Sequence, residues 1–474
     1  MGKSQKKRSM RRHNPMRVPD SHLEKGLASA STSSSKTEAI LPIIQKMESA
    51  DAGERKWACV AVSNLIYNDP STRRLLQGKN IVGVLINRLS DGEEEVVVEA
   101  AGALRNLCID GGYDICAEMY NKNIIAPLQT FIPKISDTLS QFLESPKNAP
   151  EGAQKVVYEF ADNVITILWC LSETSNKALN AVNQLALIPF LMSFLASRDQ
   201  LPVTTVTSAA QCLYVLTDDN QPAIDDVRAN LGYAPTLLEI AKSFSGPADP
   251  KGKSPAAEER TITLRVLACG ILRNVSPLPP PSAAALVDLE KEVLLPVLGP
   301  VASSVSLLEA SDAVQAIIQR QTEEPHIEKS PGKGVPKSDH RTPEEQELER
   351  IEARLRAVQL ALEILTGVCA TLPDPEAGEE ADNNDDEVEV DGEQDDDAMD
   401  DGEDAPMAQE DAAPNGTSAP SSASSFLPTL LQPLLSLIQP TPLSFAPPNA
   451  SSPHSPPGNS GFASPDVTAP QSPQ

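Results

Sequence analysis

The sequence predicts an all-α fold in which similar helices stack into an α-solenoid. The segment EAAGALRNLCID at residues 99–110 recurs in altered form five more times. Each copy carries small or branched apolar residues at positions i, i+3, i+4 and i+7, which form an apolar stripe along one side of a helix. Stacking on a similar helix buries this stripe. Two of the steps between copies are 42 and 45 residues, which is typical of helical repeats. The other copies begin at Lys56, Asp162, Thr207, Thr263 and Leu355.

The second repeat shows how one unit is built. A short apolar helix is predicted from Asn80, with Ser90 or Asp91 as the N-cap of the next helix. That long helix runs to Cys108, and Gly111 and Gly112 follow as stop signals. A unit of two or three helices with the longest one last resembles the armadillo repeat. An anchor residue near the end of each long helix aligns the six copies: Leu65, Leu107, Leu171, Leu216, Val275 and Leu365.

The predicted fold class is therefore an all-α, armadillo/HEAT-type solenoid with a disordered basic N-terminus, an acidic loop and a Pro/Ser-rich C-terminal tail. Anchor steps of 64, 59 and 90 residues indicate insertions in some repeats. We expect the following segments: a disordered basic head at 1–36, armadillo-like repeats at 37–322, a disordered loop at 323–342, a helix of a further repeat at 343–372, an acidic disordered loop at 373–424, a partial HEAT helix pair broken at Pro433 at 425–439, and a disordered tail at 440–474.

Composition argues against an enzyme. All five histidines lie in segments that we expect to be disordered, so the predicted folded body holds no imidazole for general-base or metal chemistry. No phosphate-binding loop or nucleophile motif is present. We therefore expect no catalytic residue, no cofactor and no metal. The seven cysteines form no C-x-x-C pair and fit a reducing compartment. The apolar stretch from Val293 is interrupted by Pro296, Gly299 and Pro300, which favours solenoid helices over a membrane span.

The first 17 residues carry seven Lys or Arg and no acid. This head resembles a proline–tyrosine nuclear localisation signal, with Met16 where tyrosine is usual. In such signals the basic cluster binds an acidic importin surface, and the proline with the next residue fills an apolar pocket. The alternative is an unspecific basic tail that binds nucleic acid. The predicted importin-binding residues are Lys6, Lys7, Arg8, Arg11, Arg12, Pro15 and Met16.

The net charge of −27 is concentrated near the C-terminus, because residues 357–474 hold 22 acids and no Lys or Arg. Residues 376–404 hold 17 of these acids, which suits a basic protein partner at low salt. The alternative is a solvated linker. The predicted acidic cargo loop is centred on Glu387, Glu389, Asp391, Glu393, Asp395, Asp396, Asp397, Asp400 and Asp401.

Three asparagines stand directly before an anchor residue: Asn64, Asn106 and Asn274. In armadillo proteins this position faces the concave groove and hydrogen-bonds the backbone of an extended peptide. The alternative for each asparagine is a helix cap or a hydrogen bond between repeats. Trp57 and Trp169 are further groove candidates, although a tryptophan in a helix is more often core packing. The cargo groove predicted from the sequence thus contains these five residues.

Together these parts resemble the symportin family of import adaptors. The resemblance rests on the start MGKS, the basic head with its NPM sequence, the armadillo units, and the acidic loop after the helix ending at Leu372. It implies that the head recruits a transportin-type karyopherin and that the groove holds the N-terminal peptide of one 5S-RNA-associated large-subunit ribosomal protein. The acidic loop would help to bind a second one. The implied protein shuttles between cytoplasm and nucleus, with no direct nucleic acid or membrane partner.

One feature departs from that family. Its members carry further HEAT repeats after the acidic loop, whereas this sequence ends in a Pro/Ser tail at Gln474. We therefore expect a shortened chain whose segment 425–439 lacks a stacking neighbour. Two other classes remain open on the residues alone: a general armadillo transport receptor, and a scaffold protein.

Overall fold

The computed structural model describes residues 33–68, 70–145, 152–243, 255–278, 287–323, 342–369 and 422–440. These residues form helices, turns and bends, without a β-strand among them. The helices are α1 (Ser33–Lys46), α2 (Ala52–Asn68), α3 (Pro70–Gly78), α4 (Ile81–Arg88), α5 (Glu94–Asn121), α6 (Ile125–Glu144), α7 (Ala153–Ser172), α8 (Asn176–Asn183), α9 (Leu187–Ala196), α10 (Val203–Leu216), α11 (Gln221–Ala229), α12 (Tyr233–Lys242), α13 (Pro255–Asn274), the π-helical η4 (Glu290–Leu294), α14 (Leu295–Ala302), α15 (Leu307–Glu323), α16 (Pro343–Cys369) and α17 (Ser422–Leu437).

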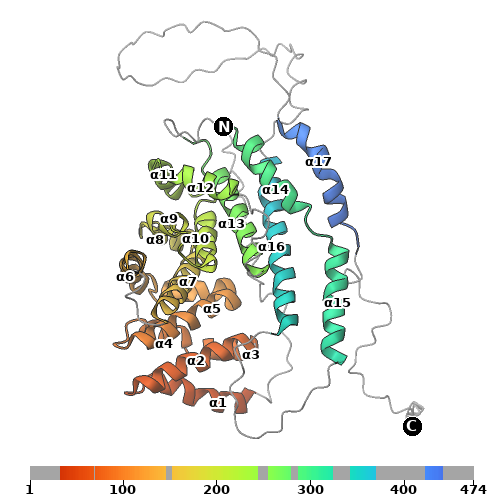
Figure 1. Cartoon of the computed structure of the whole chain (residues 1–474). Coiled ribbons are helices and arrows are strands. Elements are labelled where there is room, and N and C mark those ends of the chain that lie inside the picture. Colours follow the sequence, from red (N-terminus) through yellow and green to blue (C-terminus); the bar gives the residue numbers. More distant parts are fainter. Residues whose placement is uncertain are drawn as a thin grey trace, which may run out of the picture.

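Six of these helices stack in chain order and form the spine of the molecule (Figure 1). We call α2, α5, α7, α10, α13 and α16 the ladder helices, and the six repeated segments of the sequence all fall on them. A second helix covers each of the later rungs, because α4, α6, α9, α12 and α14 pack on α5, α7, α10, α13 and α16 respectively. The predicted all-α armadillo solenoid is thus confirmed.

Small residues allow the ladder helices to approach one another. Ala100, Ala101 and Ala103 of α5 are at most 1% exposed, and α5 packs against both α2 and α7. Apolar surface removed from water stabilises such contacts by about 25 cal/mol per Å². Because each ladder helix has a neighbour on either side, the apolar core runs through the whole stack instead of forming one central cluster.

The stop signals after the second repeat hold, but the predicted N-cap is wrong. Gly112 has φ 63° and ψ −149°, which breaks α5 into two helical pieces at the expected place. At the start of α5 the N-cap is Glu93, and its side chain makes no capping hydrogen bond. Asp91 instead accepts a hydrogen bond from the Glu93 N–H at 3.1 Å and binds two arginines, so its carboxylate is already committed.

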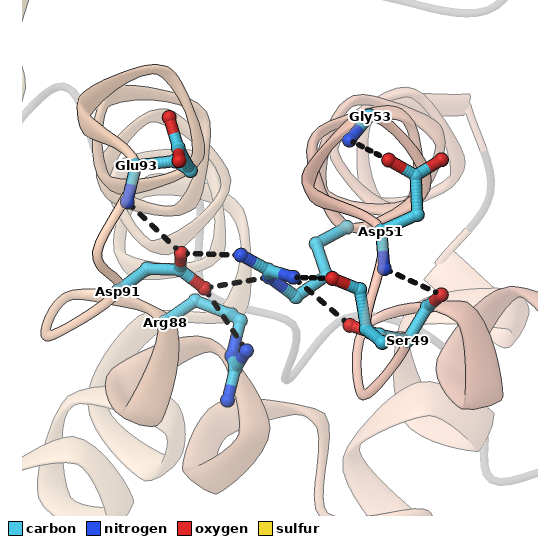
Figure 2. A network of polar contacts seen from close by, with 8 residues as sticks. Ser49, Asp51, Gly53, Arg88, Asp91 and Glu93 are labelled. Atoms are coloured by element: carbon cyan, nitrogen blue, oxygen red, sulfur yellow. Dashed lines mark hydrogen bonds and ion pairs between the residues drawn. The ribbon is translucent and has the colours of Figure 1, made fainter.

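This carboxylate is the centre of a polar tie between the first two repeats (Figure 2). Arg55 donates from Nε to Asp91 Oδ2 at 2.8 Å and from Nη2 to Oδ1 at 2.7 Å. Its Nη1 donates to the carbonyl oxygens of Ser49 and Ala50, both at 3.0 Å. Arg88 adds a contact of 3.0 Å to Asp91. The loop before α2 is therefore fastened to the loop before α5.

The C-terminal part of the described chain differs from expectation in two respects. The segment at 425–439, expected to lack a stacking neighbour, packs on α14 and η4. The predicted helix pair broken at Pro433 is a single helix, α17, which runs through Pro428 and Pro433. Each proline removes one backbone hydrogen bond, but its φ angle suits a helix. Packing on α14 and η4, with Leu430 only 5% exposed, holds the helix together.

The apolar stretch from Val293 forms solenoid helices, as predicted: η4, α14 and α15. Within the described ranges, no helix taken alone has the length and apolar character to cross a bilayer. Two bent helix pairs reach that length and apolar character when the two helices of a pair are taken together. They are Asn176–Asn183 with Leu187–Ala196, and Glu290–Ala302 with Leu307–Arg320.

Candidate functional site

One face of the ladder helices carries partly exposed polar side chains, and we call it the ladder face. Residues seven apart on a helix lie two turns apart on the same side. Trp57 therefore shares a side with Asn64 on α2, and Glu99 shares one with Asn106 on α5. The corresponding positions on the next two rungs are Asn163 on α7 and Ser208 on α10. The ladder face thus consists of Trp57, Asn64, Glu95, Glu99, Asn106, Glu159, Asp162, Asn163, Ser208 and Gln211, all of them half-buried or exposed.

The two tryptophans lie in opposite environments. Trp57 is 52% exposed, and the Lys46 ammonium lies 5.0 Å from the centre of its ring, a cation–π arrangement. Trp169 is only 4% exposed, and its indole N–H has no hydrogen-bond partner within the described residues. Trp57 is therefore available to a ligand, whereas the ring of Trp169 is core packing.

The asparagines next to the anchors are used mostly within the fold. Asn106 donates from Nδ2 to Ser63 Oγ on α2 at 2.7 Å and accepts a hydrogen bond from Arg105 at 3.1 Å. Asn274 donates to the Tyr214 carbonyl oxygen on α10 at 3.2 Å. The bonds to Ser63 and to the Tyr214 carbonyl oxygen join neighbouring repeats, which is the alternative that the sequence leaves open. Asn64 is exposed on α2.

Two amides on the same face were missed by the sequence analysis. Asn163 on α7 and Gln211 on α10 are half-buried, and neither side chain is hydrogen-bonded within the described part of the chain. A Cβ atom on Gly102 would lie 3.5 Å from Asn163 Nδ2, so the missing side chain at Gly102 leaves room beside this amide. The available signal was their spacing, seven and four residues before Cys170 and Val215, the positions aligned with the asparagines.

Carboxylates flank these amides. Glu95 and Glu99 on α5 lie near Glu159 on α7, and burial raises the pKa of Glu99, with further contributions from the negative charges of Glu159 and Glu95. Lys56 opposes this shift and lies 2.9 Å from Glu95. On the same face, the Ser208 hydroxyl donates a hydrogen bond to Asp162. A partly buried acid with a raised pKa gains from the approach of a cation.

The other predicted sites lie outside the described residues. These are the importin-binding signal at 6–16 and the acidic cargo loop at 387–401. The five histidines, for which no site is predicted, also lie outside the described residues. In the part of the chain that the structure describes, no group of three or more His, Cys, Asp or Glu side chains is arranged to hold a metal ion.

Comparison with known proteins identifies relatives of the chain. Residues 69–109 match the Armadillo/beta-catenin-like repeat family. The chain is 33% identical over 282 residues to Syo2, an armadillo repeat protein involved in nucleocytoplasmic transport from Schizosaccharomyces pombe, a match covering 58% of this chain and 40% of Syo2. It is 26% identical over 396 residues to human HEAT repeat-containing protein 3, covering 78% of this chain and 55% of that protein.

A further relative is Symportin 1 from Chaetomium thermophilum, which is 23% identical over 280 residues, covering 58% of this chain and 38% of that protein. The chain therefore spans about half the length, or less, of the curated relatives that it matches. The match to the repeat family, the stacked helices and the similarity to these relatives all indicate a protein built from helical repeats. The chain is a stack of helices in which residues 69–109 match the armadillo repeat, and it is similar in sequence to Syo2 and Symportin 1.

Proposed function

We propose that the chain is a non-enzymatic nuclear import adaptor and chaperone. It would bind newly made 5S-RNA-associated large-subunit ribosomal proteins, link them to a transportin-type importin and so support ribosome biogenesis. The names of Syo2 and Symportin 1, one of which refers to nucleocytoplasmic transport, support the adaptor part. The ribosomal cargo rests on the symportin resemblance of the sequence.

The observation that carries the proposal is the chemistry of the ladder face. It combines the carboxylates of Glu95, Glu99 and Glu159 with two amides, Asn163 and Gln211, that form no hydrogen bond with any residue in the described ranges. An extended basic segment would place its Lys or Arg side chains beside the carboxylates, while the amides hydrogen-bond its backbone. Ribosomal proteins are strongly cationic, and an anionic surface competes with stray RNA for them.

Two further parts of the proposal rest on sequence alone. The basic head, with Arg12, Pro15 and Met16, would bind the karyopherin, and the acidic loop centred on Asp395 would hold a second basic cargo. With these two contacts the protein would shuttle between cytoplasm and nucleus. Exposed ion pairs contribute about 0–1 kcal/mol each, so retention of cargo would need many pairs and would fall with salt.

The direct test is affinity purification of the full chain at low and high salt, with mass spectrometry of the bound proteins. We expect basic ribosomal proteins at low salt and fewer of them at high salt. The double variant Asn163→Ala with Gln211→Ala should lose cargo while its melting temperature stays unchanged. Its matched control is Asn106→Ala, which removes an amide already bonded to Ser63. This variant should lower the melting temperature and have a smaller effect on cargo retention than the double variant. Equal cargo retention by the double variant and the parent chain would remove the ladder face from the mechanism.

A second test separates the adaptor from a general transport receptor. Residues 1–20 are fused to a fluorescent reporter, because an adaptor needs a localisation signal of its own and a receptor does not. Nuclear accumulation supports the adaptor, and loss of accumulation on Pro15→Ala with Met16→Ala assigns it to the predicted signal. A reporter that stays cytoplasmic favours the receptor. Recovery of ligase or cytoskeletal subunits without ribosomal proteins favours a scaffold.

A further inference from the structure

Helix α15 sits at the end of the stack. It follows α14 through a short turn at residues 303–306 and packs on α16 (Figure 1). The opposite side of α16 faces α13, where Arg273 donates to the Gly367 carbonyl oxygen at 2.5 Å. Ile351, which lines the contact with α15, and Gly367 are sixteen residues apart. At about 100° per residue they lie about 160° apart around the helix axis. Helix α15 thus occupies the place where the ladder helix of a following repeat would stack.

The contact between α15 and α16 is poorly packed. A cavity of ≈160 Å³ lies between them, lined among others by Ala310 and Ala313 of α15 and by Ile351 and Leu355 of α16. Both apolar side chains of α16 remain half-buried even with α15 in place. The alanines are too short to fill this pocket, which is partly open to solvent and is also lined by Glu347, Arg350 and Arg354, so few apolar contacts join the two helices there.

The rest of α15 adds little to hold it. Within residues 307–320, the large apolar side chain that α15 buries is Ile317, which is 1% exposed. Leu308 and Ile318 on the same helix are 52% and 51% exposed. Ser311 is buried, yet its hydroxyl has no hydrogen-bond partner within the described residues. In α14, by contrast, most side chains are buried. A helix with little buried apolar surface and an unsatisfied polar group belongs to the low-stability end of a structure.

We propose that α15 is a displaceable cap on the end of the solenoid. It swings away from α16 while the ladder helices stay folded, and opening exposes Ile351 and Leu355 at the surface where a stack is extended. The cap closes this end because the side of α15 that faces away from the pocket carries polar residues such as Asp312 and Gln315. The proposal does not depend on the adaptor function.

Native-state hydrogen exchange of the full chain tests this proposal. We expect the amides of residues 307–320 to exchange about 100-fold faster than those of α14, yet slower than an unfolded peptide. Exchange as slow as in α14 would show that α15 is a fixed part of the core. Exchange at the rate of an unfolded peptide would show that no cap forms.

A pair of variants on α15 links its opening to the cavity. Ala313→Leu places a larger side chain in the void and should slow exchange of α15 several-fold. Ala316→Leu is the matched control, because Ala316 is exposed on the same helix and its substitution should leave the rates unchanged. Ile317→Ala should speed exchange in α15 and leave α14 and α10 unaffected. Parallel acceleration of those two helices would place α15 in the same cooperative unit and overturn the proposal.

Discussion

Gly270 of α13 lies directly against the ring of Tyr214 on α10. A Cβ atom at position 270 would be 2.5 Å from Tyr214 Cε2 and 3.0 Å from Ile364 Cδ1 on α16. The Tyr214 hydroxyl in turn donates to Glu363 of α16 at 3.1 Å. Three ladder helices therefore meet at a point where only a hydrogen atom fits, and this contact fixes their spacing.

We expect Gly270→Ala to destabilise the chain by about 1–3 kcal/mol, because the added methyl group must displace an aromatic ring. Gly102→Ala is the matched control on α5. A Cβ atom there meets Asn163 Nδ2 at 3.5 Å, an ordinary contact, so the better helix propensity of alanine should stabilise by about 0.5–1 kcal/mol. Urea unfolding of both variants measures the two effects. If both substitutions change the free energy of unfolding in the same direction, the α10–α13–α16 contact is not as tight as the structure indicates.

Asp91→Ala should be among the most destabilising substitutions at a charged position. The Asp91 side chain is 3% exposed and binds Arg55 and Arg88, and hydrogen bonding from Arg55 holds its pKa below the usual range. Removing it leaves the guanidinium groups of Arg55 and Arg88 without their carboxylate partner, although Arg55 keeps its bonds to the Ser49 and Ala50 carbonyl oxygens, so we expect a cost of about 1–3 kcal/mol. Chemical denaturation at pH 7 measures the loss.

The control for that experiment is Lys155→Ala, which breaks an exposed pair with Glu159 at 3.7 Å and should change stability by less than about 0.5 kcal/mol. Because the pKa of Asp91 is lowered on folding, its contribution is present above the unfolded pKa and is lost as the pH falls through the folded pKa. The difference between parent and Asp91→Ala should therefore shrink in strong acid. A difference that persists unchanged there would argue against an ionic tie.

Glu99→Gln should stabilise the chain and weaken cargo binding. Burial raises the pKa of Glu99, and Glu159 and Glu95 add to the shift, so its ionised form opposes folding at pH 7. The folded chain binds this proton more tightly than the unfolded chain. The stability gain should therefore be full above the folded pKa and vanish below the unfolded pKa. We expect a gain below about 1 kcal/mol, measured by thermal unfolding between pH 4 and pH 8.

Binding of a Lys/Arg-rich peptide, followed by fluorescence anisotropy, gives the second readout for Glu99→Gln. The control is Asp226→Asn, an exposed acid on α11 away from the ladder face, which should change neither quantity. A ladder-face acid that can be neutralised with no loss of peptide affinity would show that the face does not hold basic cargo.

Native thiol reactivity should be confined to Cys369. The other six cysteines are buried, and burial raises the pKa of Cys59 and of Cys269 to about 12. Since the thiolate is the reactive form, iodoacetamide at pH 8 should modify Cys369 in the folded chain and all seven cysteines in denaturant. Mass spectrometry of the peptides provides the count. Rapid labelling of Cys59 or Cys269 under native conditions would show that the α2 or α13 core opens.

The amino-acid sequence determined the fold class. Apolar residues at helical spacing, recurring at intervals typical of helical repeats, leave each helix with a stripe that only another such helix can bury, so stacking follows from the pattern itself. The break at Gly112 also follows locally, because glycine readily adopts φ 63°. The basic head and the acidic segment are likewise visible in the sequence, and their predicted roles as signal and cargo loop concern residues outside the described ranges.

Only the tertiary structure decided which polar groups remain available. The sequence leaves two roles open for Asn106 and Asn274, a ligand contact or a bond between repeats, and in the structure their amides bond to Ser63 and to the Tyr214 carbonyl oxygen on neighbouring helices. On the ladder face, the amides of Asn163 and Gln211 have no hydrogen bond among the residues that the structure describes. Packing between helices also buries Trp169, keeps α17 helical at Pro433 and places α15 against α16. These outcomes depend on which groups meet across helices distant in sequence, and periodicity along one chain does not specify such contacts.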